Sequence, residues 1–194
     1  MRDLQHIRSL LKRGLRLTIP VAATLVLACA SGGGRSGPAI RTGPESGSVF
    51  VVGGGSMGPE LFTRFIELAG GPDAPIVVIP TAGGQPAYTQ SSAGAQQLRN
   101  LGAKDVVVMH APDKAVANSD TFVARLKLAR GIWFGGGRHY RLVDSYGGTK
   151  SEAAFHDVVA RGGVVGGSSA GASILASYLV RGAPSNDNRI MSHP

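Results

Sequence analysis

The 194-residue sequence predicts an α/β fold in three layers, with helices covering both faces of a parallel sheet. Short apolar runs rich in β-branched residues alternate with longer amphipathic segments, and these runs lack a polar face. Strands that are apolar on both sides are typical of a parallel sheet buried between helices. Three of the runs end in glycine-rich loops, and in this fold class the loops at the carboxyl ends of the strands build the functional site.

Five strands are expected, each a short apolar run: Ser48–Val52, Ile76–Ile79, Val106–Met109, Ile132–Phe134, and Val164–Val165 with its glycine flanks. A helical spacing of apolar residues follows most of them, at Pro59–Ala69, near Ala87–Leu101, and at Asp120–Ala129, Glu152–Ala160 and Ala170–Tyr178. Pro59 suits a first helical turn, and Gly70 and Gly102 suit helix ends. The length allows one domain with a sizeable core, which we place at residues 48–194.

The first 28 residues have the proportions of a signal peptide. A basic segment at 2–16 precedes an uncharged apolar stretch at 17–28, which is shorter than the ~20 residues of a transmembrane helix. The single cysteine, Cys29, ends this stretch in the sequence VLAC, which resembles a bacterial lipoprotein box. We therefore expect an exported protein held at the periplasmic or extracellular face of a membrane by acyl chains on Cys29, with residues 29–47 as a flexible tether. An ordinary signal peptide with a chance cysteine and a weak membrane anchor are the alternatives.

The formal net charge of +8 does not indicate a nucleic-acid partner. Half of this surplus lies in residues 1–28, and the other basic residues are scattered singly, without a basic run or interleaved aromatic residues. A spread of this kind is typical of a solvated surface. The single cysteine also excludes an internal disulfide framework.

The glycine-rich loop after the first strand fits a dinucleotide-binding pattern, through Gly53, Gly55 and Gly58. That pattern also requires an acidic residue near the end of the second strand, where it holds the ribose. The second strand instead runs into the sequence IPTAG, which has no carboxylate. The loop therefore predicts a tight strand-to-helix turn, and the sequence indicates neither a cofactor nor a metal ion.

The loop after the last strand contains a G-x-S-x-G nucleophile elbow at residues 167–171. A serine at a sharp strand-to-helix turn has a strained backbone, and its neighbours must be small because their backbones pass close together. Such a turn exposes the hydroxyl of Ser169 at the sheet edge, and it lets the backbone N–H of Ala170 point at a developing oxyanion. The motif therefore predicts a catalytic Ser169, and a Gly/Ser-rich structural turn is the alternative.

A third loop follows the fourth strand, at what we expect to be the same edge of the sheet. Its glycines, Gly135 to Gly137, are candidates for a second oxyanion donor. Arg138 is a candidate for binding a substrate carboxylate through its planar guanidinium group. His139 is a candidate for a hydrogen bond to substrate, although a lone histidine in a loop is more often a bystander than a base.

Four segments in order, VVGGGSM, IVVIPTAGG, WFGGGRHYRLVDSYGGT and RGGVVGGSSAGAS, resemble the cyanophycinase-like serine peptidases over most of residues 48–182. The resemblance implies a class I glutamine amidotransferase-like, flavodoxin-like fold. It also implies that Ser169 corresponds to the family nucleophile, and that Gly136 and Gly137 correspond to the glycine pair lining its site. The family commonly has an acidic or basic residue and then a glutamine after this pair, where this sequence has Arg138 and His139.

The same resemblance implies hydrolysis of peptide-like bonds around β-linked aspartyl residues. Cyanophycin, an aspartate backbone with an arginine on each side-chain carboxyl, is the best-known substrate, and relatives include aspartyl dipeptidases. A glutamine amidotransferase is disfavoured because that chemistry normally uses a cysteine at the elbow, and the only cysteine here is Cys29.

A serine nucleophile needs a general base within hydrogen-bond reach, oriented in turn by an acid. The resemblance implies that both follow the nucleophile on later strands, whereas residues 170–194 show no strand pattern that presents a base. His193 stands beside a terminal proline, and no motif supports His110 or His156. We therefore expect a hydrolase domain that lacks its C-terminal part, with a catalytically inactive, exported binding lipoprotein as the alternative.

Overall fold

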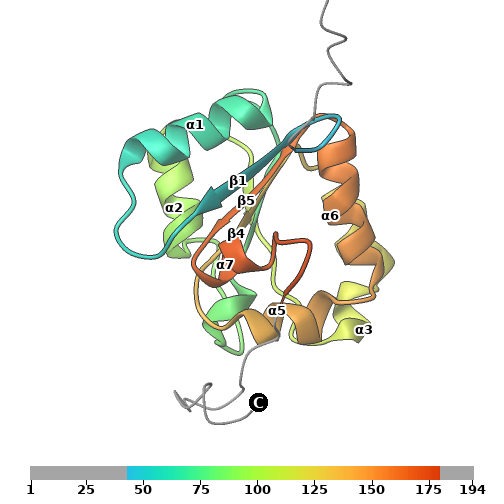
Figure 1. The fold of residues 1–194 in the computed structure, drawn as a ribbon. Helices are drawn as coiled ribbons and strands as arrows, with labels where there is room; N and C mark the ends of the chain where they lie inside the picture. The colour runs from blue at the N-terminus through green and yellow to red at the C-terminus, as the bar shows by residue number, and fades with distance from the viewer. Residues whose placement is uncertain (1–42, 180–194) are drawn as a thin grey trace, which may run out of the picture. The chain divides into compact units, whose positions relative to one another are not determined.

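The computed structural model describes residues 43–179, which form an α/β domain (Figure 1). The expected signal peptide, Cys29 and the tether up to residue 42 lie outside the described residues, as do residues 180–194 with His193. What the sequence predicts for them stays a prediction. Among residues 43–179, no helix combines the length and the apolar character needed to cross a membrane.

Five parallel strands form one sheet in the order β1-β5-β4-β2-β3. Figure 1 labels the neighbouring strands β1, β5 and β4 of this sheet. Their bounds are β1 Ser48–Val52, β2 Ile76–Ile79, β3 Val106–Val108, β4 Gly131–Phe134 and β5 Val164–Ser168. The predicted parallel sheet is therefore confirmed. Because all five strands run in the same direction, the loops after β1, β5 and β4 lie side by side at one edge.

Helices connect the strands and cover the sheet on both faces. Their bounds are α1 Pro59–Ala69, α2 Ala93–Asn100, α3 Lys114–Ala117, α4 Asp120–Leu128, α5 His139–Tyr146, α6 Lys150–Ala160 and α7 Ala170–Ser173, with a short 3-10 helix, η1, at Thr81–Gly83. Pro59 stands in the first turn of α1, and Gly70 ends that helix with a left-handed φ of 114°. Both ends of α1 are as the sequence predicts.

The helix predicted from near Ala87 begins only at Ala93. The reason is the side-chain amide of Gln90, which donates to the Val108 carbonyl oxygen (2.9 Å) and accepts from the Val108 N–H (2.8 Å). The Gln90 side chain thus makes the two backbone hydrogen bonds that a further strand would make at the edge strand β3. This pairing keeps the segment before α2 in a non-helical conformation.

The last predicted helix is also shorter than expected: α7 ends at Ser173 and not at Tyr178. The N–H groups of Leu175 and Ala176 bond to carbonyl oxygens three residues earlier, which is the tighter pattern of a turn. Tyr178 is 85% exposed, so the apolar residues after Ser173 do not form one buried helical face.

Two described helices, α3 and α5, were not predicted from the sequence. Glycines flank α5 on both sides and favour a loop, yet its Leu142 and Tyr146 are buried in the core. Helix α3 has only four residues, and its first turn is stabilised by the Asp113 carboxylate, which accepts a hydrogen bond from the Val116 N–H (2.9 Å).

Alternate residues of each strand point to opposite faces of the sheet, which explains why the strands are apolar on both sides. Ile132 and Phe134 of β4 pack with α4, α5 and α6, whereas Trp133 packs with α1 and α2 on the other face. Figure 1 shows α1 and α2 on one side of the sheet and α6 on the other. The Trp133 ring lies 5.0 Å from the Phe62 ring and 5.1 Å from the Phe65 ring, between centroids. Two separate apolar layers therefore fix the sheet whose edge carries the glycine loops.

Candidate active site

The turn between β5 and α7 is at Ser169. Its backbone has φ 53° and ψ −116°, and it is the single non-glycine residue with a positive φ among residues 43–179. The Ser169 N–H donates to the Val52 carbonyl oxygen (3.1 Å), and its own carbonyl oxygen accepts from the N–H groups of Ala172 and Ser173 (3.0 Å each). These bonds hold a conformation that L-residues rarely adopt. The side chain is exposed at the edge of the sheet.

Close backbone packing around this turn explains the spacing of the G-x-S-x-G motif. A Cβ atom at Gly171 would overlap the carbonyl oxygen of Phe134, and one at Gly167 would lie 2.5 Å from the carbonyl oxygen of Gly171. Neither position has room for a side chain. The neighbouring Ser168 is the last residue of β5 and is 8% exposed, so the two adjacent serines differ sharply in accessibility.

Bare backbone lies on both sides of the Ser169 side chain. A Cβ atom built at Gly136, after β4, would lie 3.4 Å from the Ser169 Cβ and 3.9 Å from its Oγ. A Cβ atom built at Gly54, after β1, would lie 3.9 Å from the same Cβ and 4.0 Å from Oγ. The loops after the two strands that flank β5 therefore both reach the serine, and both do so with a glycine.

Gly54, which the structure brings close to Ser169, was not among the site residues predicted from the sequence, because its loop was given only the role of a tight turn. The glycine pattern alone does not say which other strand end the loop meets. The missing information is that β1 pairs directly with β5, with Val52 opposite Ser168. Such a pairing joins the two ends of the described domain and leaves no local signal in the sequence.

The other residues of the β4 loop are held mainly by η1. Gly137 has φ 140°, and a Cβ atom there would overlap the carbonyl oxygen of Ala82. That same oxygen accepts hydrogen bonds from the Arg138 N–H (2.8 Å) and from Nη1 of Arg141 (2.9 Å). Arg138 is exposed, and His139 is half-buried as the first residue of α5. Arg138 and His139 therefore lie at the same edge of the sheet as Ser169, after the β4 strand. Two hydrogen bonds to the Ala82 carbonyl oxygen hold this part of the chain against η1.

Ala170 is the first residue of α7 and is 4% exposed. At this position a backbone N–H has no acceptor within its own helix. The helix has only four residues, so we assign no role to its dipole. The N–H of Ala170 stays a candidate oxyanion donor because it directly follows the turn.

A buried polar cluster at the ends of β2 and β3 was not predicted. The Thr81 hydroxyl lies 2.9 Å from Nδ1 of His110 and 2.8 Å from the hydroxyl of Tyr146, which also accepts from the Ala111 N–H (3.1 Å). Burial lowers the pKa of His110, and burial raises the pKa of Tyr146 to about 12, against the opposing effect of its hydrogen bond with Thr81. The cluster fixes η1, which in turn holds the β4 loop.

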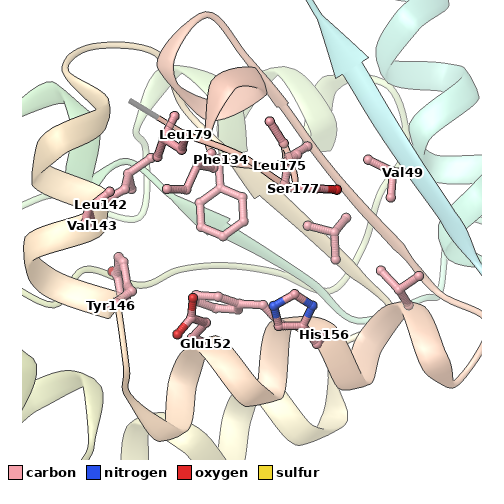
Figure 2. A pocket seen from close by; sticks show the side chains of 16 residues that line it. Val49, Phe134, Leu142, Val143, Tyr146, Glu152, His156, Leu175, Ser177 and Leu179 are labelled. Atoms are coloured by element: carbon pink, nitrogen blue, oxygen red, sulfur yellow. The ribbon is translucent and has the colours of Figure 1, made fainter. Parts of the chain in front are cut away.

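His156 faces a different part of the molecule. It lines an apolar pocket of about 500 Å³, together with Glu152 on the same helix and with Phe134, Tyr146 and Leu175 opposite (Figure 2). Ser169 does not line this pocket. Of the histidines considered as a base, His110 hydrogen-bonds Thr81 and His156 faces this pocket, so the structure brings neither to the serine. No group of three or more His, Cys, Asp or Glu side chains within residues 43–179 is arranged to hold a metal ion.

Comparison with known proteins identifies the family of the chain. Residues 49–190 match the peptidase family S51. The chain is similar to the cyanophycinase of Synechococcus elongatus, at 31% identity over 147 residues, which cover 74% of this chain and 45% of that protein. It is also similar to the cyanophycinase of Geminocystis herdmanii, at 29% identity over 145 residues, which cover 73% of this chain and 53% of the relative. The chain thus spans about half the length of these relatives.

A solved structure supports the same fold. The crystal structure of a peptidase from an acI-B1 Actinobacterium superposes with a TM-score of 0.60 and 28% sequence identity, covering 69% of this chain and 58% of that one. The likeness confirms the sequence-based expectation of a flavodoxin-like, class I glutamine amidotransferase-like arrangement of strands and helices.

Proposed function

Because the chain belongs to peptidase family S51, we propose that it is a serine-type peptidase with Ser169 as nucleophile, acting on β-aspartyl, isopeptide-type bonds. One observation carries the proposal. Ser169 combines a strained backbone, an exposed hydroxyl and flanking glycine backbone at the carboxyl edge of a parallel sheet. A structural turn needs none of these features, because glycine at this position would avoid the strain, whereas a nucleophile elbow combines all three.

In the proposed reaction, Oγ of Ser169 attacks the carbonyl carbon of the isopeptide bond, and the hydroxyl proton passes to a general base. The carbonyl oxygen becomes an oxyanion, and in this proposal it accepts hydrogen bonds from the N–H groups of Ala170 and Gly136. Gly137 is a weaker candidate because a Cβ atom built there would meet Ala82 and Gly83, and not Ser169. The amine then leaves with a proton, and water hydrolyses the ester on Ser169, which restores the hydroxyl and releases the acid.

The substrate class is proposed from the relatives, which are cyanophycinases. An arginine joined by an amide to an aspartate side chain keeps a free carboxylate. Arg138 is exposed beside the glycine loop, and its guanidinium can bind such a carboxylate with two parallel hydrogen bonds. In this proposal His139 contacts the substrate on the same side.

A fluorophosphonate probe tests the nucleophile. We expect it to label the parent protein and the Ser168→Ala variant, in which the neighbouring buried hydroxyl is removed, but not the Ser169→Ala variant. Hydrolysis of a β-aspartyl-arginine dipeptide should follow the same order, and Arg138→Ala should raise KM more than it lowers kcat. Equal labelling of the parent protein and Ser169→Ala would refute the proposed nucleophile.

A catalytically inactive binding protein is the second candidate function. The positions of His110 and His156 favour it, because neither hydrogen-bonds Ser169. This role predicts that the β-aspartyl-arginine dipeptide binds without being cleaved, and that Arg138→Ala weakens the binding. Calorimetric titration combined with product detection therefore separates the two functions.

We also propose that the protein is exported and anchored to a membrane through acylated Cys29. The basic segment, the apolar stretch and the VLAC sequence support this proposal. Expression in bacteria with labelled palmitate should label the parent protein and place it in the membrane fraction. Cys29→Ala should abolish the label, and an equally labelled Cys29→Ala variant would rule out acylation at this residue.

A further inference from the structure

The glycine loop after β1 meets the nucleophile, although no role at the site has been assigned to it. Its Gly54 faces Ser169 from the side opposite Gly136. In contrast to the glycines of the elbow, Gly54 is not required by crowding, because a Cβ atom there would have no protein atom closer than 3.9 Å. Nor is its φ in the left-handed region that favours glycine. The protein could therefore carry a side chain at Gly54, and the space it would fill lies beside the Ser169 hydroxyl.

A substrate that reacts with Ser169 has to come close to that space. A reacting carbonyl carbon approaches its nucleophile to about 3–3.5 Å, so the atoms attached to it come to rest roughly 4 Å from Oγ. A methyl group on residue 54 would stand 4.0 Å from the same oxygen. A substituent on the reacting carbon that points toward the β1 loop would then meet this methyl group.

We propose that Gly54 is a specificity-determining position, whose missing side chain admits an acyl group with a bulky substituent next to the reacting carbonyl. The inference rests on the proposed function, because it takes Ser169 as the nucleophile. The inference also explains why Gly54 has no side chain. In a polymer, a β-aspartyl bond joins the polymer chain on its acyl side to an amino acid on its amine side. Both parts of the substrate need room beside Ser169, one on the side of Gly54 and the other on the side of Gly136.

Two sulfonyl fluorides of different size test this inference on the full chain. Methanesulfonyl fluoride carries one methyl group on sulfur, and phenylmethanesulfonyl fluoride carries a benzyl group. Each reacts when Oγ of Ser169 displaces fluoride from sulfur, with the release of HF. The ratio of their second-order labelling rate constants, benzyl to methyl, therefore measures the room beside Ser169 and cancels changes in its nucleophilicity.

We expect Gly54→Ala to lower this ratio by about tenfold or more, since one extra methyl group in a fitted site changes selectivity by about 10–200-fold. Gly54→Val should lower it further. Gly53→Ala is the matched control, because a Cβ atom at Gly53 meets no atom within 4 Å and its φ is also outside the left-handed region. This variant should keep the parent ratio.

The outcomes separate the two proposals. If neither reagent labels Ser169 in the parent protein, the proposed nucleophile fails and the inference fails with it. If both reagents label the parent and Gly54→Ala leaves the ratio unchanged, or slows both reagents equally, the inference about Gly54 is overturned while the nucleophile stands. The thermal unfolding midpoint of each variant verifies folding, and Gly54→Ser provides a second side chain of similar size should Gly54→Ala unfold.

Discussion

The strained backbone of Ser169 predicts that glycine at this position is more stable than alanine, which is the reverse of the order found at most positions. A residue in a sparsely populated φ/ψ region costs about 1–3 kcal/mol, and glycine avoids most of this cost because it has no Cβ. Glycine also makes the unfolded chain more flexible, which costs about 0.4–1 kcal/mol relative to alanine. With φ 53° and ψ −116° the strain outweighs the entropy, so we expect Ser169→Gly to be more stable than Ser169→Ala by about 1 kcal/mol. Neither variant has the hydroxyl, so its loss cancels in the comparison.

Urea unfolding followed by circular dichroism measures this difference. Ser169→Gly should have the higher midpoint at an unchanged slope, and its thermal midpoint should be roughly 2–4 °C higher. The same pair of substitutions at Ser173 is the control, because that residue ends the same short helix and has no positive φ. There alanine should be the more stable replacement, by up to ~1 kcal/mol.

The reasoning is refuted if Ser169→Ala exceeds Ser169→Gly in stability by the margin found at Ser173. The backbone at Ser169 would then be relaxed in solution, and the turn would not be the strained elbow that the hydrogen bonds to Val52 and Ala172 hold in place. A change in the urea slope in only one of the variants would instead indicate a change in the native or unfolded ensemble, and it would equally contradict a purely local strain.

Two further predictions concern the supports of the site. Gly171→Ala should lower the free energy of unfolding by about 1–3 kcal/mol, because the new methyl group would overlap the Phe134 carbonyl oxygen; a urea midpoint equal to that of the parent protein would contradict the close packing of the elbow. Tyr146→Phe should also lower the free energy of unfolding, by about 1–3 kcal/mol, since the Thr81 hydroxyl and the Ala111 N–H lose a buried partner. Because burial raises the pKa of Tyr146 from 10.0 to about 12, its stabilising contribution is complete below pH 10 and is lost as the pH rises through 12, so the parent protein should lose stability more steeply than Tyr146→Phe in that window.

The strands could be predicted because a strand that is buried on both faces consists almost entirely of apolar residues. Ile76–Ile79 is buried at every residue, and its sequence has no polar position. In β5 the glycines before Ser168 were predicted only as flanks of the strand, since glycine carries no apolar signal. In the fold those glycines are required by close packing: a Cβ atom at Gly166 would lie 2.9 Å from the carbonyl oxygen of Phe50 on β1.

The site was predictable only where its parts are close in sequence. The elbow at Ser169 is a local motif, and its neighbours lie within two residues. The approach of Gly54 to that serine depends on the pairing of β1 with β5, and the contact of Thr81 with His110 and Tyr146 depends on the pairing of β2 with β3 and on the packing of α5. Strand order is set by the whole core, so no single segment of sequence encodes it.

The distribution of glycine around the elbow is itself an argument for a functional serine. The segment has glycine at positions 166, 167 and 171, where φ is not in the left-handed region and the need is for space. At position 169, where a positive φ makes glycine the least strained residue, the sequence has a serine with an exposed side chain. A turn selected for stability alone would have glycine at position 169. The exposed serine at this position supports the proposal that the hydroxyl group is functional, and the stability order of Ser169→Gly and Ser169→Ala measures how large the strain is.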